Sequence, residues 1–269
     1  MKKLFTILPF LFLFCVNSWA QKDSCCTFVA AIRGDVVDFA VDNLDNVYVL
    51  NSSDQLKKYN AKGDSVAVFN NVKKFGKVSA IDASNPLKIL LYYKDFSTIV
   101  TLDRLMNQQN VIDLRKQNIF QPSVVALSYD NNIWLFDEGT SKLKKIDDNG
   151  KLLLETSDFR QLFDESPNLK TMNDQEGLIY LYDPQQAVFV FDYYGALKNK
   201  ILVKNWNNFK VVEKFIYGTN NDTLHRYNIN SFIYNDYKID AIKNSIKINF
   251  TASRLYALKK DELKIYSLR

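Results

Sequence analysis

Histidine, glycine and proline are scarce in this sequence. In 269 residues there are one histidine, eight glycines and five prolines. Because His225 is the single histidine, the chain cannot build a metal site from several histidines, the ligand set of many zinc enzymes. No glycine-rich dinucleotide loop, no Walker loop and no Cys-x-x-Cys pair occurs either. These absences leave little support for an enzyme, and we expect no catalytic residue, no metal site and no cofactor.

Cysteine is too sparse to hold the fold together. Of the three cysteines, Cys15 lies in an apolar N-terminal stretch, and Cys25 and Cys26 are adjacent. Adjacent cysteines are not the framework of a disulfide-stapled domain, so stability must come from a core. We interpret them as small, half-buried residues of an edge strand; pairing with each other, a bond to a partner and free thiols are the alternatives. An apolar content of 47% supplies a core.

The first twenty residues have the pattern of a secretory signal peptide. Lys2 and Lys3 precede an apolar run over residues 4–16, and a small-x-small cleavage site follows at 18–20. The run has 13 residues and contains a proline, whereas a membrane-spanning helix needs about 20 apolar residues. We therefore expect residues 1–20 to be a signal peptide that is removed.

Removal of this peptide fixes the size and charge of the mature protein. It would leave residues 21–269 as a single domain with a net charge of +3, because the peptide carries two lysines and no acidic residue. Such a small charge favours neither nucleic acid nor a membrane surface as a partner. A membrane anchor and a lipoprotein acylated at Cys15 are the alternatives.

One turn pattern recurs along the chain. An apolar residue, then Asn or Asp, two free positions and a glycine occur at 59–63, 146–150 and 191–195. An Asn or Asp side chain can accept a hydrogen bond from the backbone two residues on, and glycine supplies the positive φ of a hairpin turn with a bulge. The glycines are 87 and 45 residues apart. Each segment is therefore predicted to be a hairpin, with a period of about 43 to 45 residues.

The turns belong to longer repeats. Upstream of each turn, an apolar strand, an Asp/Asn turn and an aromatic-rich strand occur at 39–50, 125–136 and 171–182. Weaker copies occur at 78–105, 209–235 and 246–268, which makes six units of four strands. Repeats of about 40 to 45 residues with four strands each are typical of β-propeller blades.

The strand composition and the chain ends support this fold. Residues 47–50 and 133–136 are apolar at consecutive positions, as expected for strands buried on both faces. The last unit has only three strands, and the segment Cys25–Ile32 has no other partner. We therefore predict an all-β, six-bladed β-propeller of four-stranded antiparallel blades, closed by the N-terminal strand. Closure also removes two open sheet edges.

The apolar-Asp-x-x-Gly turn and the Asp/Asn-x-Ile/Val-Tyr/Trp strand entry resemble six-bladed propellers of the NHL-repeat and TolB-like kind. The resemblance covers the mature chain and implies a fold more than a function, because that group includes protein-binding scaffolds, sugar-binding modules and lactonases. In the lactonases, acidic and Asn side chains of the inner strands hold calcium in the central channel. On the expected inner strands here, only Glu213 and Asn249 are placed to be considered.

The connections between blades are the candidate binding surface. Each places an aromatic residue beside basic or amide residues, a composition enriched at protein interfaces. The candidate partner-binding residues are Phe75, Phe120, Phe163, Trp206 and Phe209. The alternative is that these side chains pack into the seams between blades as core.

Three short motifs have simpler explanations. Residues 33–35 read Arg-Gly-Asp, where turn chemistry is sufficient. Residues 64–66 and 222–224 resemble an O-glycosylation acceptor used by some bacteria, although a motif of three residues often occurs by chance. The Asp/Asn clusters offer oxygen ligands suited to Ca²⁺, yet turn formation explains their recurrence.

From these observations we predict a non-catalytic protein-binding propeller of the bacterial cell envelope. It would be exported to the periplasm, as a subunit or accessory of an envelope protein assembly, and a partner would associate it with the outer membrane. Because the last repeat ends at Arg269, we expect no C-terminal sorting domain. A glycan-binding module and a lactonase-like metal-dependent hydrolase are the alternatives.

Overall fold

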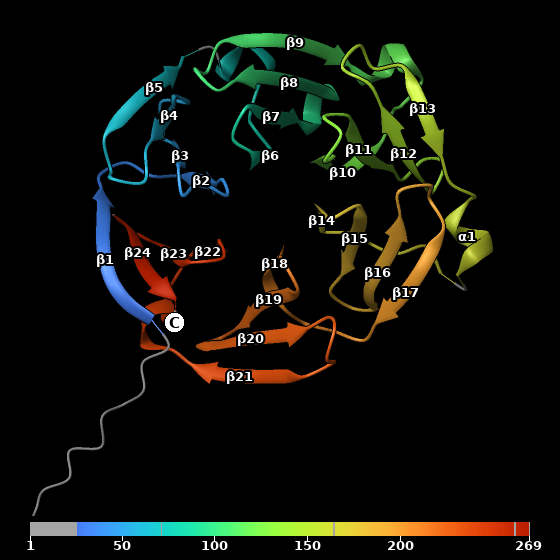
Figure 1. Ribbon diagram of the computed structural model, residues 1–269. Helices are drawn as coiled ribbons and strands as arrows, with labels where there is room; N and C mark the ends of the chain where they lie inside the picture. The colour runs from blue at the N-terminus through green and yellow to red at the C-terminus, as the bar shows by residue number, and fades with distance from the viewer. Residues whose placement is uncertain (1–25, 71, 164, 261, 269) are drawn as a thin grey trace, which may run out of the picture.

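The computed structural model describes residues 26–70, 72–163, 165–260 and 262–268. Its strands form six four-stranded sheets arranged as blades around a central axis (Figure 1). The innermost strands β2, β6, β10, β14, β18 and β22 contact their neighbours in that order, and β22 contacts β2. The prediction of a six-bladed propeller with antiparallel four-stranded blades is therefore confirmed. The predicted signal peptide, residues 1–20, lies outside the described residues.

Each of the first five blades is a continuous stretch of chain. The first three contain β2 (Asp38–Val41), β3 (Val47–Leu50), β4 (Leu56–Tyr59) and β5 (Ser65–Phe69); β6 (Ala80–Asn85), β7 (Lys88–Tyr93), β8 (Thr98–Asp103) and β9 (Gln108–Asp113); and β10 (Pro122–Leu127), β11 (Ile133–Asp137), β12 (Lys142–Ile146) and β13 (Leu152–Glu155). The next two contain β14 (Thr171–Gln175), β15 (Leu178–Asp183), β16 (Ala187–Asp192) and β17 (Leu197–Ile201); and β18 (Asn207–Val212), β19 (Phe215–Asn220), β20 (Thr223–Asn228) and β21 (Tyr234–Lys238).

The sixth blade joins the two ends of the chain. It contains β22 (Lys247–Phe250), β23 (Arg254–Lys259), β24 (Glu262–Leu268) and the outer strand β1 (Cys26–Arg33). β1 runs antiparallel to β24, from the pair Cys26 and Leu268 to the pair Arg33 and Glu262. The predicted closure by the N-terminal strand is confirmed.

Among the described residues, helical structure is confined to short turns between strands. It comprises η1 (Val72–Phe75), η2 (Lys94–Phe96), η3 (Leu114–Gln117), α1 (Phe159–Leu162) and η4 (Asp240–Ile242). No helix in the described part of the chain is long and apolar enough to cross a membrane.

The predicted turns form as expected. The Asp147 carboxylate accepts hydrogen bonds from the backbone N–H of Asn149 at 2.8 Å and of Lys151 at 2.9 Å. Gly150 has a φ of +85°, and the β12–β13 register shifts between Lys145 and Ile146. Asn60 and Asp192 make the same contacts in their blades. The local turn chemistry therefore fixes the end of each of these hairpins.

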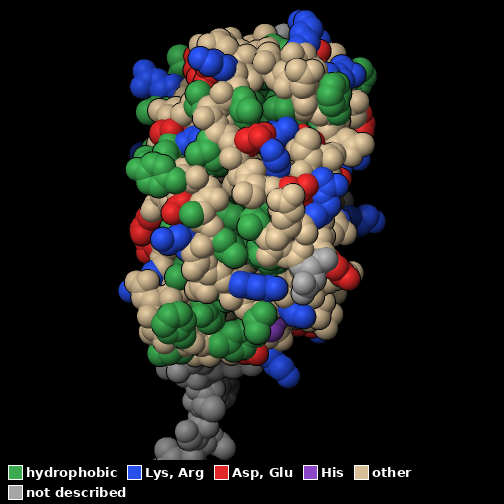
Figure 2. Space-filling model, turned by 90° about the vertical axis from the view of Figure 1, so that its right-hand side faces the viewer, with side chains coloured by type: hydrophobic (Ala, Val, Ile, Leu, Met, Phe, Trp, Pro, Cys, Tyr) green, Lys and Arg blue, Asp and Glu red, His purple; other side chains and the backbone are tan. Residues whose placement is uncertain are grey.

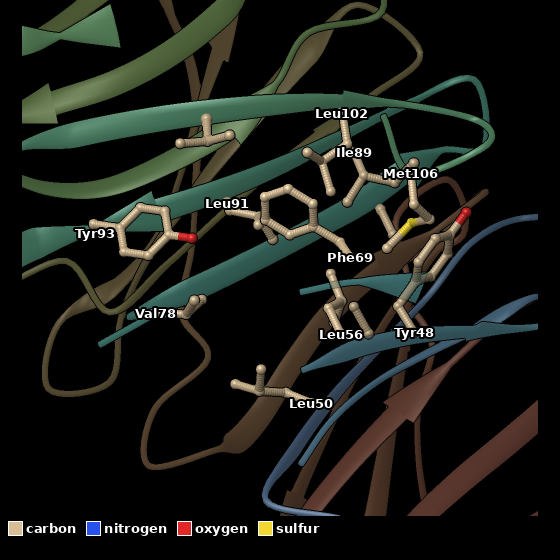
Figure 3. Packing of buried hydrophobic residues seen from close by; sticks show 13 residues of the cluster. Tyr48, Leu50, Leu56, Phe69, Val78, Ile89, Leu91, Tyr93, Leu102 and Met106 are labelled. Carbon is tan, nitrogen blue, oxygen red and sulfur yellow. The ribbon is translucent and has the colours of Figure 1, made fainter. Parts of the chain in front are cut away.

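The core consists of seams between blades. The buried hydrophobic residues form six clusters, each drawn from two neighbouring blades. Figure 3 shows the seam between the first two blades, where Tyr48 and Leu56 from one blade face Ile89 and Leu102 from the next. Residues 47–50 and 133–136 are buried throughout, as predicted. A blade thus buries both faces only when it has two neighbours.

Candidate functional site

The six inner strands enclose a central cavity. Its volume is about 680 Å³, and all six inner strands contribute residues to its wall. This volume lies within the range of roughly 300–1,000 Å³ that small-molecule sites occupy. The cavity is therefore the first candidate site.

Side chains of the inner strands tie neighbouring blades together around the cavity. Asp82 accepts a hydrogen bond from the backbone N–H of Leu127 at 2.8 Å. Asn173 accepts one from Val211 at 2.8 Å, and Asn208 accepts one from Ile248 at 2.9 Å. An inner strand has no neighbour on its axial edge, so its backbone donors need such acceptors. These three side chains therefore stabilise the ring by bonding neighbouring blades to each other.

Opposite charges line the two ends of the cavity. Lys170 directly precedes β14 and Glu176 directly follows it, and both line the cavity. Lys94 begins η2, which directly follows β7, and β7 is antiparallel to the inner strand β6. Lys94 therefore lies at the end of the cavity where the inner strands begin, together with Lys170. Glu213 follows β18, at the end of Glu176. One mouth of the cavity therefore carries lysines and the other carries glutamates.

Two charged groups in the wall have shifted pKa values. Burial lowers the pKa of the Lys210 ammonium, although the nearby Asp82 carboxylate partly offsets that effect. Burial raises the pKa of Asp174, although this carboxylate accepts hydrogen bonds from Ser128 Oγ at 2.9 Å and the Tyr129 N–H at 3.3 Å. Shifts caused by burial mark sites where charge is poorly compensated.

The residues that line the cavity differ from the prediction that only Glu213 and Asn249 would be polar residues of the inner strands facing the channel. Glu213 lines the cavity as expected, but Asn249 does not, and its side chain bonds the adjacent backbone N–H of Phe250 at 2.8 Å. Asp82, Asp174 and Lys210 line the cavity as well. No cluster of three or more His, Cys, Asp or Glu side chains suited to a metal ion occurs among the described residues.

Four of the five candidate partner-binding residues lie in seams. Trp206 is only 5% exposed, and Phe209 is stacked on Tyr182 with ring centroids 4.4 Å apart. Phe75 and Phe163 are partly buried against the cores of their seams. These positions agree with the alternative of seam packing.

Phe120 is the exception, with 62% of its surface exposed. It lies on the face that carries the blade connections, which we call the connection face. It is the one member of the set whose side chain is freely accessible.

The opposite face carries the turns between the first and second strands and between the third and fourth strands of the blades, and we call it the turn face. Large apolar side chains are exposed at the tips of these turns. They are Leu44, Leu87, Leu105, Tyr129, Tyr194, Phe232 and Ile233. Turn tips are usually polar, so this set has no explanation in turn formation. Composition alone could not show it, because the sequence does not reveal which turn residues point outward.

Aromatic residues gather on the turn face beside Tyr129, which lines the cavity. The rings of Tyr129 and Tyr193 lie 4.7 Å apart, and Tyr194 follows with a centroid 6.3 Å from Tyr193. Lys145 lies 3.2 Å above the Tyr193 ring and 2.8 Å from Asp130, to which the Tyr193 hydroxyl also donates a hydrogen bond. Tyr193 is thus fixed, while Tyr129 and Tyr194 are exposed.

The remaining sequence motifs have structural roles. His225 stacks on Trp206 at 5.0 Å on β20, and it does not line the cavity. In the Arg-Gly-Asp segment, Asp35 accepts hydrogen bonds from the Ser52 backbone and hydroxyl. Cys26 is buried in β1, as an edge-strand residue, and Cys25 lies outside the described residues. The acceptor residues Ser65 and Thr223 lie in strands.

Comparison with solved structures supports the fold. The chain is similar to the β-propeller domain of Cps50 (Swd1) from Myceliophteria thermophila, with a TM-score of 0.62 and 8% identity over 91% of this chain and 100% of that one. It is similar to virginiamycin B lyase from Staphylococcus aureus, with a TM-score of 0.61 and 11% identity over 89% and 99%.

The WD40 domain of Neurospora crassa Pan2 gives a TM-score of 0.60 and 9% identity over 91% and 96%. No protein-family model matches the sequence, and no curated protein matches it significantly. These neighbours include an enzyme and WD40 propellers. At such low identity the likeness establishes the fold and leaves the activity open.

Proposed function

We propose that this protein is a non-catalytic, protein-binding propeller of the bacterial cell envelope. It would be exported through its N-terminal signal sequence and act in the periplasm, as a subunit or accessory of an outer-membrane or periplasmic assembly. The signal pattern of residues 1–20 supports export. The exposed apolar side chains of the turn face support binding to a protein.

One comparison within the molecule carries this proposal. In the turns after β2, β8 and β16, the residue whose N–H bonds the Asp carboxylate is Leu44, Leu105 or Tyr194. In the turns after β4 and β12, the equivalent residue is Lys62 or Asn149. The same turn therefore forms with a polar residue. The turn therefore does not require Leu44, Leu105 or Tyr194 to be apolar, and binding to a partner would explain why these side chains are exposed.

The composition of the turn face fits a protein partner. Tyr194 is 83% exposed, and Tyr and Phe are enriched at the centres of protein interfaces. Figure 2 views the ring from the side of α1, β13 and β17, where hydrophobic side chains lie in small groups among charged ones. A mixed surface of this kind is ordinary for a protein's flank, so the turn face is a stronger candidate than the flank.

The test is a triple variant, Leu44→Asn, Leu105→Asn and Tyr194→Asn. Asparagine already occupies the equivalent position at residue 149, so the turns should persist and Tm should change by only a few degrees. Tagged wild-type protein and the variant are purified in parallel from detergent-solubilised envelopes and compared by quantitative mass spectrometry. We expect the main co-purifying protein to fall at least tenfold.

The matched control is Phe120→Asn on the connection face. It removes an exposed aromatic residue similar in size to Tyr194. This variant should retain the partner. Loss of the partner in the control but not in the triple variant would move the interface to the connection face. Retention of the partner in both variants would contradict the proposal.

The aromatic cluster favours a second candidate, a glycan-binding module. The exposed ring of Tyr129 lines the cavity together with Glu176, and the exposed ring of Tyr194 lies beyond Tyr193. Aromatic faces and carboxylates together can bind the apolar and hydroxyl groups of a sugar. A glycan array probed with wild-type protein and with Tyr129→Ala tests this. Binding of a glycan that is lost in the variant would favour this candidate.

A further inference from the structure

Lys210 places an ammonium group at the wall of the central cavity. It belongs to the inner strand β18, and its neighbours in the strand are fixed: Phe209 stacks on Tyr182, and the Val211 N–H donates to Asn173. The backbone at this position is therefore held on both sides.

The charge of Lys210 is compensated only in part, by the electrostatic effect of Asp82. No described residue forms a hydrogen bond or an ion pair with its ammonium, in contrast to other lysines within the blades. Those lysines have partners: Lys144 with Asp137 at 2.7 Å, Lys145 with Asp130 at 2.8 Å and Lys247 with Asp38 at 2.6 Å. Burial lowers the pKa of Lys210, which agrees with an unpaired cation.

The carboxylate that interacts electrostatically with Lys210 is already engaged in hydrogen bonds. One oxygen of Asp82 accepts the Ser84 N–H at 2.8 Å, and the other accepts the Leu127 N–H at 2.8 Å. Asp82 is therefore held by hydrogen bonds within its own blade and to the next blade, and it is not free to pair with the lysine. An anion that enters the cavity could therefore pair with Lys210, whose ammonium has no hydrogen-bond or ion-pair partner among the described residues.

The rest of the wall defines the ligand. Val41, Val124, Val125 and Phe250 contribute apolar surface, which suits a hydrocarbon or aromatic body. The wall holds five acidic residues and three lysines, which are Asp42, Asp82, Asp174, Glu176, Glu213, Lys94, Lys170 and Lys210. This excess of acids disfavours a ligand with several negative charges.

We propose that the central cavity binds an organic monocarboxylate, whose carboxylate pairs with Lys210 and whose apolar body packs on the surrounding valines. The mouth that carries Lys94 and Lys170 is the entry that favours an anion. This inference concerns the inside of the ring and does not depend on the function proposed for the turn face.

The test uses three acids and their uncharged amides: benzoate, octanoate and indole-3-acetate. Binding to the full-length mature protein is measured at pH 7 by calorimetry and by saturation-transfer NMR. We expect at least one acid to bind at least tenfold more tightly than its amide. In the variant Lys210→Met, which keeps the apolar stem, that acid should bind at least tenfold more weakly.

Two controls keep the result specific. Lys204→Met removes an exposed lysine that does not line the cavity, and it should bind the acid like wild type. The bound acid should also slow reductive methylation of Lys210, and leave that of Lys204 unchanged, in peptide mass spectrometry. Equal binding of acid and amide, unchanged binding in a folded Lys210→Met variant, or no binding of any of the three acids would overturn the proposal.

Discussion

Replacement of Trp206 by alanine should destabilise the ring, although this residue lies in a connection between blades. Its indole is 5% exposed, stacks on His225 and covers Gly218, where an added Cβ would lie 2.6 Å from the ring. Truncation would leave a cavity between the fourth and fifth blades. Buried Phe or Trp to Ala changes cost about 3–5 kcal/mol.

Phe209 lies in the same seam, so the double variant Trp206→Ala and Phe209→Ala should lose about 6–10 kcal/mol. A domain is stable by only about 5–15 kcal/mol. We therefore expect the double variant to be largely unfolded at 37 °C, and the single variant Trp206→Ala to fold with a lower urea midpoint.

The assay is urea unfolding followed by far-ultraviolet circular dichroism, with Phe120→Ala as the control. Phe120 is exposed, so its replacement should change stability by no more than about 0.5 kcal/mol. A loss below about 1 kcal/mol in Trp206→Ala would refute the packing argument and return this residue to the binding surface.

Three further predictions follow from the fold. Deletion of residues 26–33 removes β1 and should abolish cooperative unfolding, because β24 then becomes an open edge; a Tm within two degrees of wild type would contradict ring closure. Gly150→Ala should lower Tm more than Gly63→Ala: both positions have positive φ, but only at Gly150 would a Cβ meet another residue, Ile112 at 2.8 Å. Burial raises the pKa of Asp174, so the folded state binds this proton more tightly than the unfolded state does, and the stability gained from the bound proton is lost as pH rises above about 4. Asp174→Asn should therefore reduce the slope of the urea midpoint against pH between pH 4 and 7. A slope equal to that of wild type would refute this.

The blade boundaries were predictable because they depend on local chemistry. The Asp147 carboxylate and Gly150 lie in one short segment, and their turn forms from contacts within that segment. The closing strand could be predicted by counting strands, since a final blade with three strands requires a fourth. The less regular blades were harder, because the β20–β21 turn has no glycine and ends with Phe232 at a φ of +59°.

The candidate sites were less predictable because they depend on side-chain direction. Trp206 and Phe120 occur in connections of similar composition, yet one packs into a seam and the other is exposed. In the sequence, nothing distinguishes Lys210 from the other lysines in strands. Only the closed ring shows that it lines the cavity and forms no hydrogen bond or ion pair with a described residue. The hydrogen bond from the Leu127 N–H to Asp82 joins residues 45 positions apart. Contacts of this range are set by the packed ring and not by local pattern.

Site-specific photo-crosslinking tests the central claim, that the turn face binds a protein partner. A photoreactive phenylalanine analogue is placed at Tyr194 on the turn face, and in a second strain at Leu202, which is exposed on the connection face. We expect position 194 to crosslink in living cells to the protein that co-purifies with wild type, and position 202 not to crosslink to it. Crosslinking to that protein from position 202 and not from position 194 would contradict it.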